Sequence, residues 1–517
     1  MKDTYCAYYT HSPAICEALQ SLLRLEDGDI VLDPSAGDGA LADTVLSSGK
    51  KVSVDLLEVN ADAAASLAVK YGDRGDLRFQ KRRHLVAAKS RPGDRSHVVL
   101  KETDTLTDED LDRFANAGGH YTKIIANPPY GAWQDFERRE GLKARFPGHY
   151  VRETYSLFFL RALSLLKPDG RLAIIIPDTW LYLKLHTALR QALFREAEIE
   201  DILVFPSTFF PGLTFGYSSL SIVSLRKKKP AADHRFRIVK GFRHVSELAR
   251  VCEGTLPSHC EVYSLSENSL LATDSARAIL ADEKTEALLK SPELTLGDVA
   301  DVVTGLCTGE NRRFLRAAND RVPGSRGYLT LERALLRSQS DLTGIDEPEA
   351  WIPYVKSAPK RPYAVSPDNW FLRWDRATVD FYKTDKKARF QNARFYFRPG
   401  LGIPMVKSKK IRAFLLEDRV FDQSIVGIFP KNASKRLYLL ALMNAEVVND
   451  LIRRINPTAN NSANYVKALP YREPPEAERL AIEARVRALL DAEAAGETER
   501  ADAIHAEIDE RVAAIYR

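Results

Sequence analysis

The chain has 517 residues, too many for one ordinary hydrophobic core, so we expect two or three domains. Its composition is 45% hydrophobic and 28% charged, and no apolar run approaches the ~18 residues of a membrane span, which predicts a soluble, cytoplasmic protein without membrane contact. The net charge of +5 does not by itself indicate a nucleic-acid ligand. The five scattered cysteines predict reduced thiols and no metal site.

Helix-like and strand-like segments alternate from about residue 12 to residue 225. A helix over 12–23 with Ser12 as its N-cap comes first. Apolar strands follow, and they end at Asp33, at Glu58, near Asp104 and in the segment 121–130; a helix over 154–170 and a buried strand over 171–180 come next. This alternation predicts an α/β fold with a mostly parallel, doubly wound sheet, whose ligands bind beyond the carboxyl ends of the strands.

The alternation stops at the basic cluster 226–230. We expect the first domain to cover 1–228 and a connecting region with one clear helix, 281–291, to cover 229–292. Short strands, prolines and aromatic residues predict a second, α+β domain over 293–472. Two charged amphipathic helices broken near Gly496 form a helical tail, 473–517.

A glycine-rich turn, DPSAGDG at 33–39, directly follows the first strand. Such a turn alone is weak evidence for a ligand, because a purely structural turn explains it equally well. Glu58 ends the next strand about twenty residues on, where an acidic side chain takes ribose hydroxyls. Asp104 is placed to accept from an adenine amino group, although a turn or helix-cap aspartate fits equally. Three acidic strand ends suit a nucleoside that carries a sulfonium and no pyrophosphate.

The segment IIANPPYGAW, 124–133, follows the fourth strand with residues that neither a helix nor a strand favours. Both prolines fix φ and lack an N–H donor, and Asn127 before Pro128 is driven to an extended conformation. The result is a rigid loop that carries an amide, free carbonyls and the Tyr130 ring.

Together, DPSAGDG, the acidic residue after the next strand and NPPY resemble the motifs of S-adenosylmethionine-dependent amino-methyltransferases that act on DNA. YYTHSPAICEAL, 8–19, is similar to the motif that precedes the glycine loop in gamma-class N6-adenine DNA methyltransferases, in which the target recognition domain follows the catalytic domain. The resemblance covers about 1–225 well. It implies a Rossmann-like methyltransferase domain over 1–228, a DNA target recognition domain over 293–472, and S-adenosylmethionine as cofactor.

The resemblance also implies roles for individual residues around the cofactor. Thr10 and the backbone around Ser35 and Gly37 are implied to hold the methionine carboxylate; Asp33 the methionine amino group; Glu58 the ribose; Asp104 the adenine; and Asn127 also borders the cofactor. The family usually has YTP, whereas His11 and Ser12 here separate Thr10 from Pro13, which puts the role of Thr10 in doubt.

For the target base, the Asn127 side-chain oxygen and the Pro128 carbonyl suit the two N–H bonds of an exocyclic amino group, and Pro129 stiffens the loop. Holding both bonds localises the nitrogen lone pair, so no strong base and no metal is needed. Tyr130 is expected to stack on the base, which must flip out of the duplex, and Phe210 to cover its other face, with Phe209 as the alternative. A core aromatic is an equally good interpretation of Phe210.

In the second domain, TLGDVADVVTGLCTGENRRFL, FDQSIVGIFP and NYVKALPYREPPEAERLAIEARV loosely resemble type I restriction specificity modules. Residues 372–412 contain twelve Lys or Arg and three Asp, interleaved with aromatic residues. We expect DNA contacts from a set of cations there: Arg373, Arg376, Lys386, Lys387, Arg389, Arg394, Arg398, Lys407, Lys409 and Lys410. A solvated basic face over a small aromatic core is the alternative.

The resemblance therefore implies a site-specific methyltransferase that moves a methyl group from S-adenosylmethionine to N6 of a flipped-out adenine in double-stranded DNA. It would serve a restriction–modification or related phage-defence system, with restriction or defence subunits as further partners. N4-cytosine methylation, methylation of a protein glutamine amide, and a non-catalytic DNA-specificity subunit with a vestigial methyltransferase fold stay open. Because the pattern begins within ten residues of Met1, we expect no nuclease activity from this chain.

Overall fold

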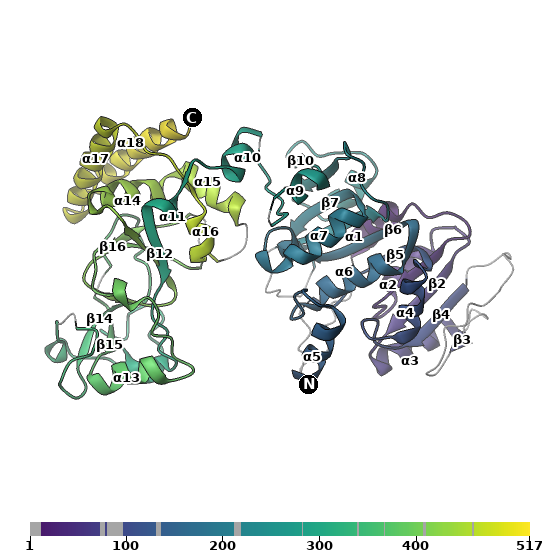
Figure 1. Cartoon of the computed structure of the whole chain (residues 1–517), viewed down its shortest axis with the longest axis horizontal. Helices are drawn as coiled ribbons and strands as arrows, with labels where there is room; N and C mark the ends of the chain where they lie inside the picture. Colours follow the sequence, from purple (N-terminus) through teal and green to yellow (C-terminus); the bar gives the residue numbers. More distant parts are fainter. Residues whose placement is uncertain are drawn as a thin grey trace. The chain divides into compact units, whose positions relative to one another are not determined.

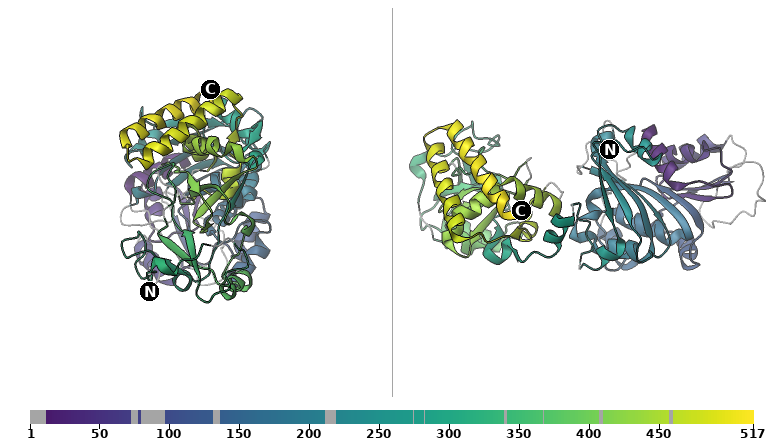
Figure 2. Two further views of the ribbon diagram at one scale, coloured as in Figure 1. Left: turned by 90° about the vertical axis from the view of Figure 1, so that its left-hand side faces the viewer. Right: turned by 90° about the horizontal axis from the view of Figure 1, so that it is seen from above.

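The computed structural model describes residues 12–72, 78–79, 97–130, 136–210, 219–273, 275–281, 283–338, 341–366, 368–406, 410–456 and 460–517. The chain forms two compact units, Met1–Ala278 and Ile279–Arg517, each with its own secondary structure (Figures 1 and 2). Within the described part of the chain, no helix combines the length and the apolar character that crossing a membrane requires.

The first unit is built on a ten-stranded sheet in the order β10-β9-β7-β8-β6-β5-β1-β2-β4-β3. Most neighbouring strands are parallel; β8 runs antiparallel between β6 and β7, and β10 antiparallel beside β9. The α/β class with a mostly parallel sheet is therefore confirmed. The strands are β1 Ile30–Asp33, β2 Ser53–Glu58, β3 Arg78–Phe79, β4 His97–Glu102, β5 Tyr121–Ala126, β6 Leu166–Pro177, β7 Glu198–Pro206, β8 Ser219–Arg226, β9 Phe236–Lys240 and β10 Glu261–Leu265.

Helices cover this sheet, as the right-hand part of Figure 1 shows for α1, α6 and α7. They are α1 Pro13–Leu23, α2 Ala40–Leu46, α3 Ala61–Gly72, α4 Glu109–Asn116, α5 Phe136–Arg145, α6 Thr154–Leu165, α7 Thr187–Glu196, α8 Glu247–Cys252 and α9 Glu267–Leu271. Ile15 and Leu19 recur at helical spacing in α1 and are fully buried, which explains why this segment docks as a helix. Ser12 occupies the predicted N-cap position, but its side chain makes no capping hydrogen bond.

The predicted connecting region, 229–292, does not form a separate element. Strands β9 and β10 add an edge to the sheet of the first unit, β9 parallel to β7, and α8 and α9 accompany them. These elements are short, five or six residues each. An apolar pattern needs more residues than that to stand out, so the extension of the sheet was not visible in the sequence.

The second unit contains two four-stranded sheets, β12-β19-β16-β17 and β13-β15-β14-β18, and a two-stranded ribbon, β11-β20. Its strands are β11 Leu294–Thr295, β12 Ala300–Thr304, β13 Leu315–Ala317, β14 Trp351–Val355, β15 Trp370–Arg373, β16 Gly400–Pro404, β17 Phe414–Leu416, β18 Val420–Phe421, β19 Ile425–Pro430 and β20 Pro470–Tyr471. Its helices are α10 Glu283–Lys290, α11 Leu296–Val299, α12 Asn311–Phe314, α13 Arg376–Thr384, α14 Arg436–Asn444, α15 Glu446–Ile455, α16 Ala463–Lys467, α17 Glu476–Ala494 and α18 Thr498–Tyr516.

Helices α17 and α18 form a hairpin that belongs to the second unit rather than a free tail. The turn lies at Gly496, whose φ of 74° is in the left-handed region that glycine tolerates best. Apolar side chains of both helices, including Ile482, Val486 and Ile508, share one buried core with α14 and α15. Figure 1 shows the two helices in yellow beside α14.

Two buried asparagines join this helical layer to the chain before β17. The Asn444 side chain accepts a hydrogen bond from the Ala413 N–H at 2.8 Å and donates one to the Ala413 carbonyl at 3.1 Å. Asn449 accepts from the Ile411 N–H at 2.6 Å. The two amides supply hydrogen bonds that a neighbouring strand would otherwise give to the backbone at 411–413. The packing of α14 and α15 against this segment therefore depends on them.

We predict that Asn444→Ala destabilises the second unit by about 2 kcal/mol, because it leaves the buried Ala413 N–H without its partner and removes one of the two donors to the Ala413 carbonyl, the other being the Tyr363 N–H. Chemical unfolding followed by tryptophan fluorescence measures the shift in the midpoint. Asn319→Ala is the matched control: Asn319 is exposed and accepts from the nearby Arg321 N–H, so we expect a change below about 0.5 kcal/mol. Equal midpoints for the two variants would contradict the structural role of Asn444.

Candidate active site

The loop after β1 is held by hydrogen bonds within itself and to its neighbours. Asp33 is 1% exposed, and its Oδ1 accepts from the Ser35 N–H at 3.1 Å. The Ala36 N–H donates to the Leu57 carbonyl of β2 at 2.9 Å, and the Thr105 hydroxyl donates to the Pro34 carbonyl at 2.6 Å. The glycine loop is thus fixed against the ends of two adjacent parallel strands.

The pKa of the Asp33 carboxyl is raised to about 7, mainly by burial and also by the nearby charges of Glu58 and Asp38, against the lowering effect of the hydrogen bond from the Ser35 N–H. A buried carboxylate at this position is costly until it meets a positive charge. The site therefore favours a cation beside Asp33.

Glu58 ends β2 and bridges the glycine loop to the next helix. Its Oε2 accepts from the Gly37 N–H at 2.8 Å and its Oε1 from the Asn60 N–H at 2.8 Å. Gly37 has a φ of 55°, in the left-handed region that glycine adopts without strain, and in this conformation its N–H points at the Glu58 carboxylate. Each oxygen keeps a lone pair for a further donor. Asp33 and Glu58, two of the predicted cofactor residues, therefore lie at the ends of neighbouring strands.

Asp104 lies just beyond β4, the next strand in the sheet. Its Oδ1 accepts from the Leu106 N–H at 3.1 Å, which is the turn role that the sequence left open. Its Oδ2 also pairs with Arg138 of α5 at 2.9 Å. Both carboxylate oxygens are thus in use in this structure, so Asp104 is at the expected place but engaged within the protein.

The NPPY segment lies at the carboxyl end of β5, which is paired with β1. The Ser35 hydroxyl donates to the backbone carbonyl of Asn127 at 3.3 Å. This bond joins the glycine loop, residues 33–39, directly to Asn127 and Pro128, which we call the Asn-Pro corner. The Thr154 hydroxyl donates to the Pro129 carbonyl at 2.8 Å. Among the described residues, no donor reaches the Pro128 carbonyl between them.

The two predicted stacking rings are both buried in this structure. Tyr130 is 0% exposed, and its hydroxyl donates to Asn127 Oδ1 at 2.7 Å. The open ring face that the sequence led us to expect is not exposed in this conformation, in which the hydroxyl is bonded to the Asn127 amide. Phe210 is 3% exposed beyond β7, as a core aromatic would be, whereas Phe209 is half-buried and stacks on Phe205.

Two polar residues at this edge of the sheet carried no signal in the sequence. Thr154 contacts a loop residue 25 positions earlier, and no local motif reveals such a contact. Asp178 follows β6, the strand beside β5, and burial raises the pKa of its carboxyl to about 7. The pairing of β5 with β6 brings Asp178 to the same edge of the sheet, whereas Thr154 reaches the loop from the start of α6.

In the second unit, the aromatic residues of 370–398 lie mainly in the core, whereas cations of the same segment lie at the surface. Trp370, Trp374, Phe395 and Tyr396 belong to a buried core, so they present no stacking surface. Lys386, Lys387 and Arg398 are exposed, with no ion pair among the described residues. This is the basic face over an aromatic core that the sequence allowed as the alternative.

The other predicted DNA-binding cations have partners within the protein. Arg373 pairs with Asp375, Arg376 with Asp346, Arg394 with Asp301 and Lys410 with Glu446, while Arg389 donates to Gln423. Thr10, Lys407 and Lys409 lie outside the described residues.

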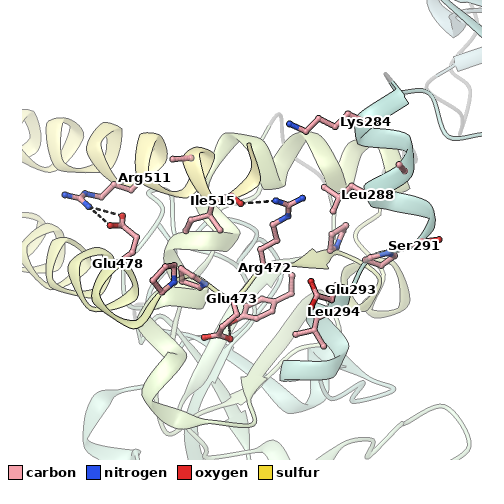
Figure 3. Close-up of a pocket in the computed structure, with 17 residues that line it drawn as sticks. Lys284, Leu288, Ser291, Glu293, Leu294, Arg472, Glu473, Glu478, Arg511 and Ile515 are labelled. Carbon is pink, nitrogen blue, oxygen red and sulfur yellow. Dashed lines mark hydrogen bonds and ion pairs between the residues drawn. The ribbon is translucent and has the colours of Figure 1, made fainter.

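A pocket of about 1000 Å³ lies in the second unit between α10, the ribbon β11-β20 and the C-terminal helices (Figure 3). Its cations are used by the fold: Arg511 binds Glu478 through two hydrogen bonds of 2.9 and 3.1 Å, and Arg472 donates to the Ile515 carbonyl. None of the predicted site residues lines this pocket, so it is separate from the site at β1 and β5.

One group among the described residues gathers metal-binding side chains. Ligand atoms of Glu247, His259 and Cys260 lie within 4.8 Å of one another. Glu247 already accepts from the backbone N–H groups of Arg243 and His244 at 2.8 and 3.2 Å and is hydrogen-bonded to His259. The carboxylate is thus satisfied without an ion, and we assign no metal to this group.

Residues 52–210 match the family Eco57I restriction-modification methylase. The type II methyltransferase M.BanIII of Aneurinibacillus aneurinilyticus is 24% identical over 317 residues, 56% of this chain and 53% of the relative. The adenine-specific methyltransferase PglX of Lacticaseibacillus casei is 20% identical over 365 residues, 68% of this chain and 29% of PglX. The chain thus spans about half the length of M.BanIII and less than a third of PglX.

Among solved structures, a nuclease-deletion mutant of the Type ISP restriction-modification enzyme LlaGI, in complex with a DNA substrate mimic, matches 92% of this chain and 54% of its own with a TM-score of 0.51. At 14% identity this likeness shows the fold alone. The family match covers β2 to Phe210 and includes the NPPY segment at 127–130. The similarity to the Eco57I restriction-modification methylase family therefore covers residues 52–210, within a unit of α/β fold with a mostly parallel sheet.

Proposed function

We propose that this protein methylates the N6 amino group of adenine in double-stranded DNA, with S-adenosylmethionine as methyl donor. The observation that carries the proposal is the contact between Ser35 and Asn127, 3.3 Å from hydroxyl to carbonyl. Through this contact the glycine loop and the NPPY segment are neighbours, which supports binding of a nucleoside cofactor beside an exocyclic amine. Methyl transfer needs donor and acceptor side by side in this way.

The residues of the glycine loop fit the cofactor. Asp33 is a buried carboxylate without a cationic partner among the described residues, and the methionine ammonium group supplies one. Glu58 keeps acceptor capacity for ribose hydroxyls after its two backbone hydrogen bonds. Bound there, S-adenosylmethionine provides an activated methyl group on a positively charged sulfur.

The Asn-Pro corner suits the amine. The Asn127 amide oxygen, which accepts from Tyr130, is an acceptor of the kind that the amine needs, and the Pro128 carbonyl has no donor among the described residues. Two acceptors that hold both N–H bonds turn the amine toward tetrahedral geometry. With the cofactor bound, the nitrogen lone pair would take up the methyl group, the S–C electron pair would stay on sulfur, and the amine would give up one proton to water.

Adenine is favoured over cytosine by the gamma-class order of motifs and by the similarity to the adenine-specific PglX. We further propose that the second unit binds the duplex through its exposed cations and that restriction or defence subunits act with this chain. Exposed lysines and arginines contact phosphates without reading bases.

Asn127→Ala is expected to lower kcat for methyl transfer by about 100-fold or more, since it removes a preorganised acceptor, while the Kd for S-adenosylmethionine changes little. Transfer of labelled methyl groups to unmethylated genomic DNA measures the rate, and modified-base sequencing identifies the base and its context. Asn268→Ala, an exposed change in the first unit, serves as control. Full activity of Asn127→Ala would refute the assignment of the corner.

Cofactor affinity is expected to rise with pH through about 7. The pKa of the Asp33 carboxyl is raised by burial to about 7, so below that pH the group is protonated and cannot pair with the methionine ammonium. Affinity should fall about tenfold for each pH unit below 7 in calorimetric titrations. In Asp33→Asn, affinity should be low and independent of pH between about 5 and 8; an unchanged pH profile would remove Asp33 from the cofactor site.

Replacing Lys386, Lys387 and Arg398 together by Ala should weaken binding to duplexes of any sequence and reduce the slope of log K against log salt by about one for each phosphate that is no longer neutralised. Fluorescence anisotropy at several salt concentrations measures both quantities. A matched variant that removes the exposed Arg485, Arg487 and Arg500 of the C-terminal helices should keep the wild-type slope. If the slope falls equally in both variants, the effect is one of net charge alone.

A further inference from the structure

Thr154 is the first residue of α6, and its hydroxyl bonds to the NPPY segment rather than within its own helix. The side chain is 1% exposed and donates to the Pro129 carbonyl at 2.8 Å. The N-cap position of α6 belongs to Glu153, whose side chain makes no capping hydrogen bond. The Thr154 hydroxyl, one position later, satisfies a carbonyl of the NPPY segment.

The Pro129 carbonyl directly follows the Pro128 carbonyl, which is the proposed acceptor for the amine. Ser35 fixes the Asn127 carbonyl, Thr154 fixes the Pro129 carbonyl, and the Pro128 carbonyl lies between them. The proline rings fix φ at 128 and 129, so the direction of the Pro128 carbonyl is set mainly by rotation about ψ of Pro128. Anchoring both flanking carbonyls restricts that rotation. The direction of the proposed amine acceptor is thus set by hydroxyls that do not touch the amine.

The start of α6 is itself held rigidly. Tyr155 and Glu153, the neighbours of Thr154, both reach Nε2 of the buried His186, at 2.9 and 3.1 Å. The Tyr155 hydroxyl is also hydrogen-bonded to Thr179 at 2.9 Å. Thr179 and His186 both lie in the segment after β6, so this one segment holds the start of α6, from which Thr154 reaches the NPPY segment.

We propose that Thr154 is a positioning residue for methyl transfer, which orients the Pro128 carbonyl toward the amine by holding the Pro129 carbonyl. The inference rests on the proposed function of the Asn-Pro corner. Within the described part of the chain, the Thr154 hydroxyl bonds to the Pro129 carbonyl alone, so its effect is expected in the chemical step rather than in cofactor binding. A misplacement of such an acceptor by a fraction of an ångström to one ångström lowers the rate by about 10- to 100-fold.

The test compares Thr154→Val, which keeps the shape and removes the hydroxyl, with Thr154→Ser, which keeps the hydroxyl. In single-turnover assays on the same DNA, we expect Thr154→Val to lose about 10- to 100-fold in rate and Thr154→Ser to stay within about threefold of wild type. The Kd for S-adenosylmethionine should change less than about threefold in both. Ser164→Ala, which removes a hydroxyl that bonds within α6, should behave as wild type.

Three outcomes would overturn the proposal: a Thr154→Val rate equal to wild type, a Thr154→Ser rate as low as that of Thr154→Val, or a loss that appears in cofactor affinity instead of in the rate. If Thr154→Val does not fold, Thr154→Ala takes its place with the same expectations. A wild-type protein that methylates no DNA would instead refute the proposed function. An active wild type with an unaffected Thr154→Val refutes this inference alone.

Discussion

The first unit depends on the pairing of β1 with β5 in a parallel sheet. This pairing brings the carboxyl ends of two strands that are about ninety residues apart in the sequence to one edge, where Ser35 meets the backbone of Asn127. Without it, the glycine loop and the NPPY segment would be two unrelated turns. The two strands are almost entirely buried, and this burial supplies the apolar stabilisation that holds polar loops in place beyond them.

This edge of the sheet concentrates buried polar groups at some cost in stability. Asp33 and Asp178 are buried carboxyls with raised pKa, and Glu58 is compensated by backbone N–H groups. A fold selected for stability alone would place apolar residues there, since burial of an uncompensated carboxylate is unfavourable. Groups of this kind are typical of a site that completes its electrostatics when ligands bind.

The second unit has its aromatic residues in the interior and its cations at the surface. Its aromatic residues fill a core between short strands, and its hairpin of long helices closes a second core against α14 and α15. The cations of the same segment are left at the surface, where the long side chains of Lys386 and Lys387 keep their charge in water. A rigid interior with a charged exterior gives such a surface a fixed geometry for contact with a polyanion.

The sequence by itself determined the α/β class, the strand ends that carry Asp33, Glu58 and Asp104, the Asn-Pro corner and the two C-terminal helices, because periodicity, glycine and proline act locally. It also indicated the methyltransferase family, through motifs that are short and contiguous. Only the tertiary structure decided that 229–278 extends the sheet, that Tyr130 turns its hydroxyl onto Asn127, that the aromatic residues near 370–396 are core, and that Thr154 holds the loop. These facts depend on contacts between residues far apart in the chain or on which face of an element is covered, and no local pattern contains that information.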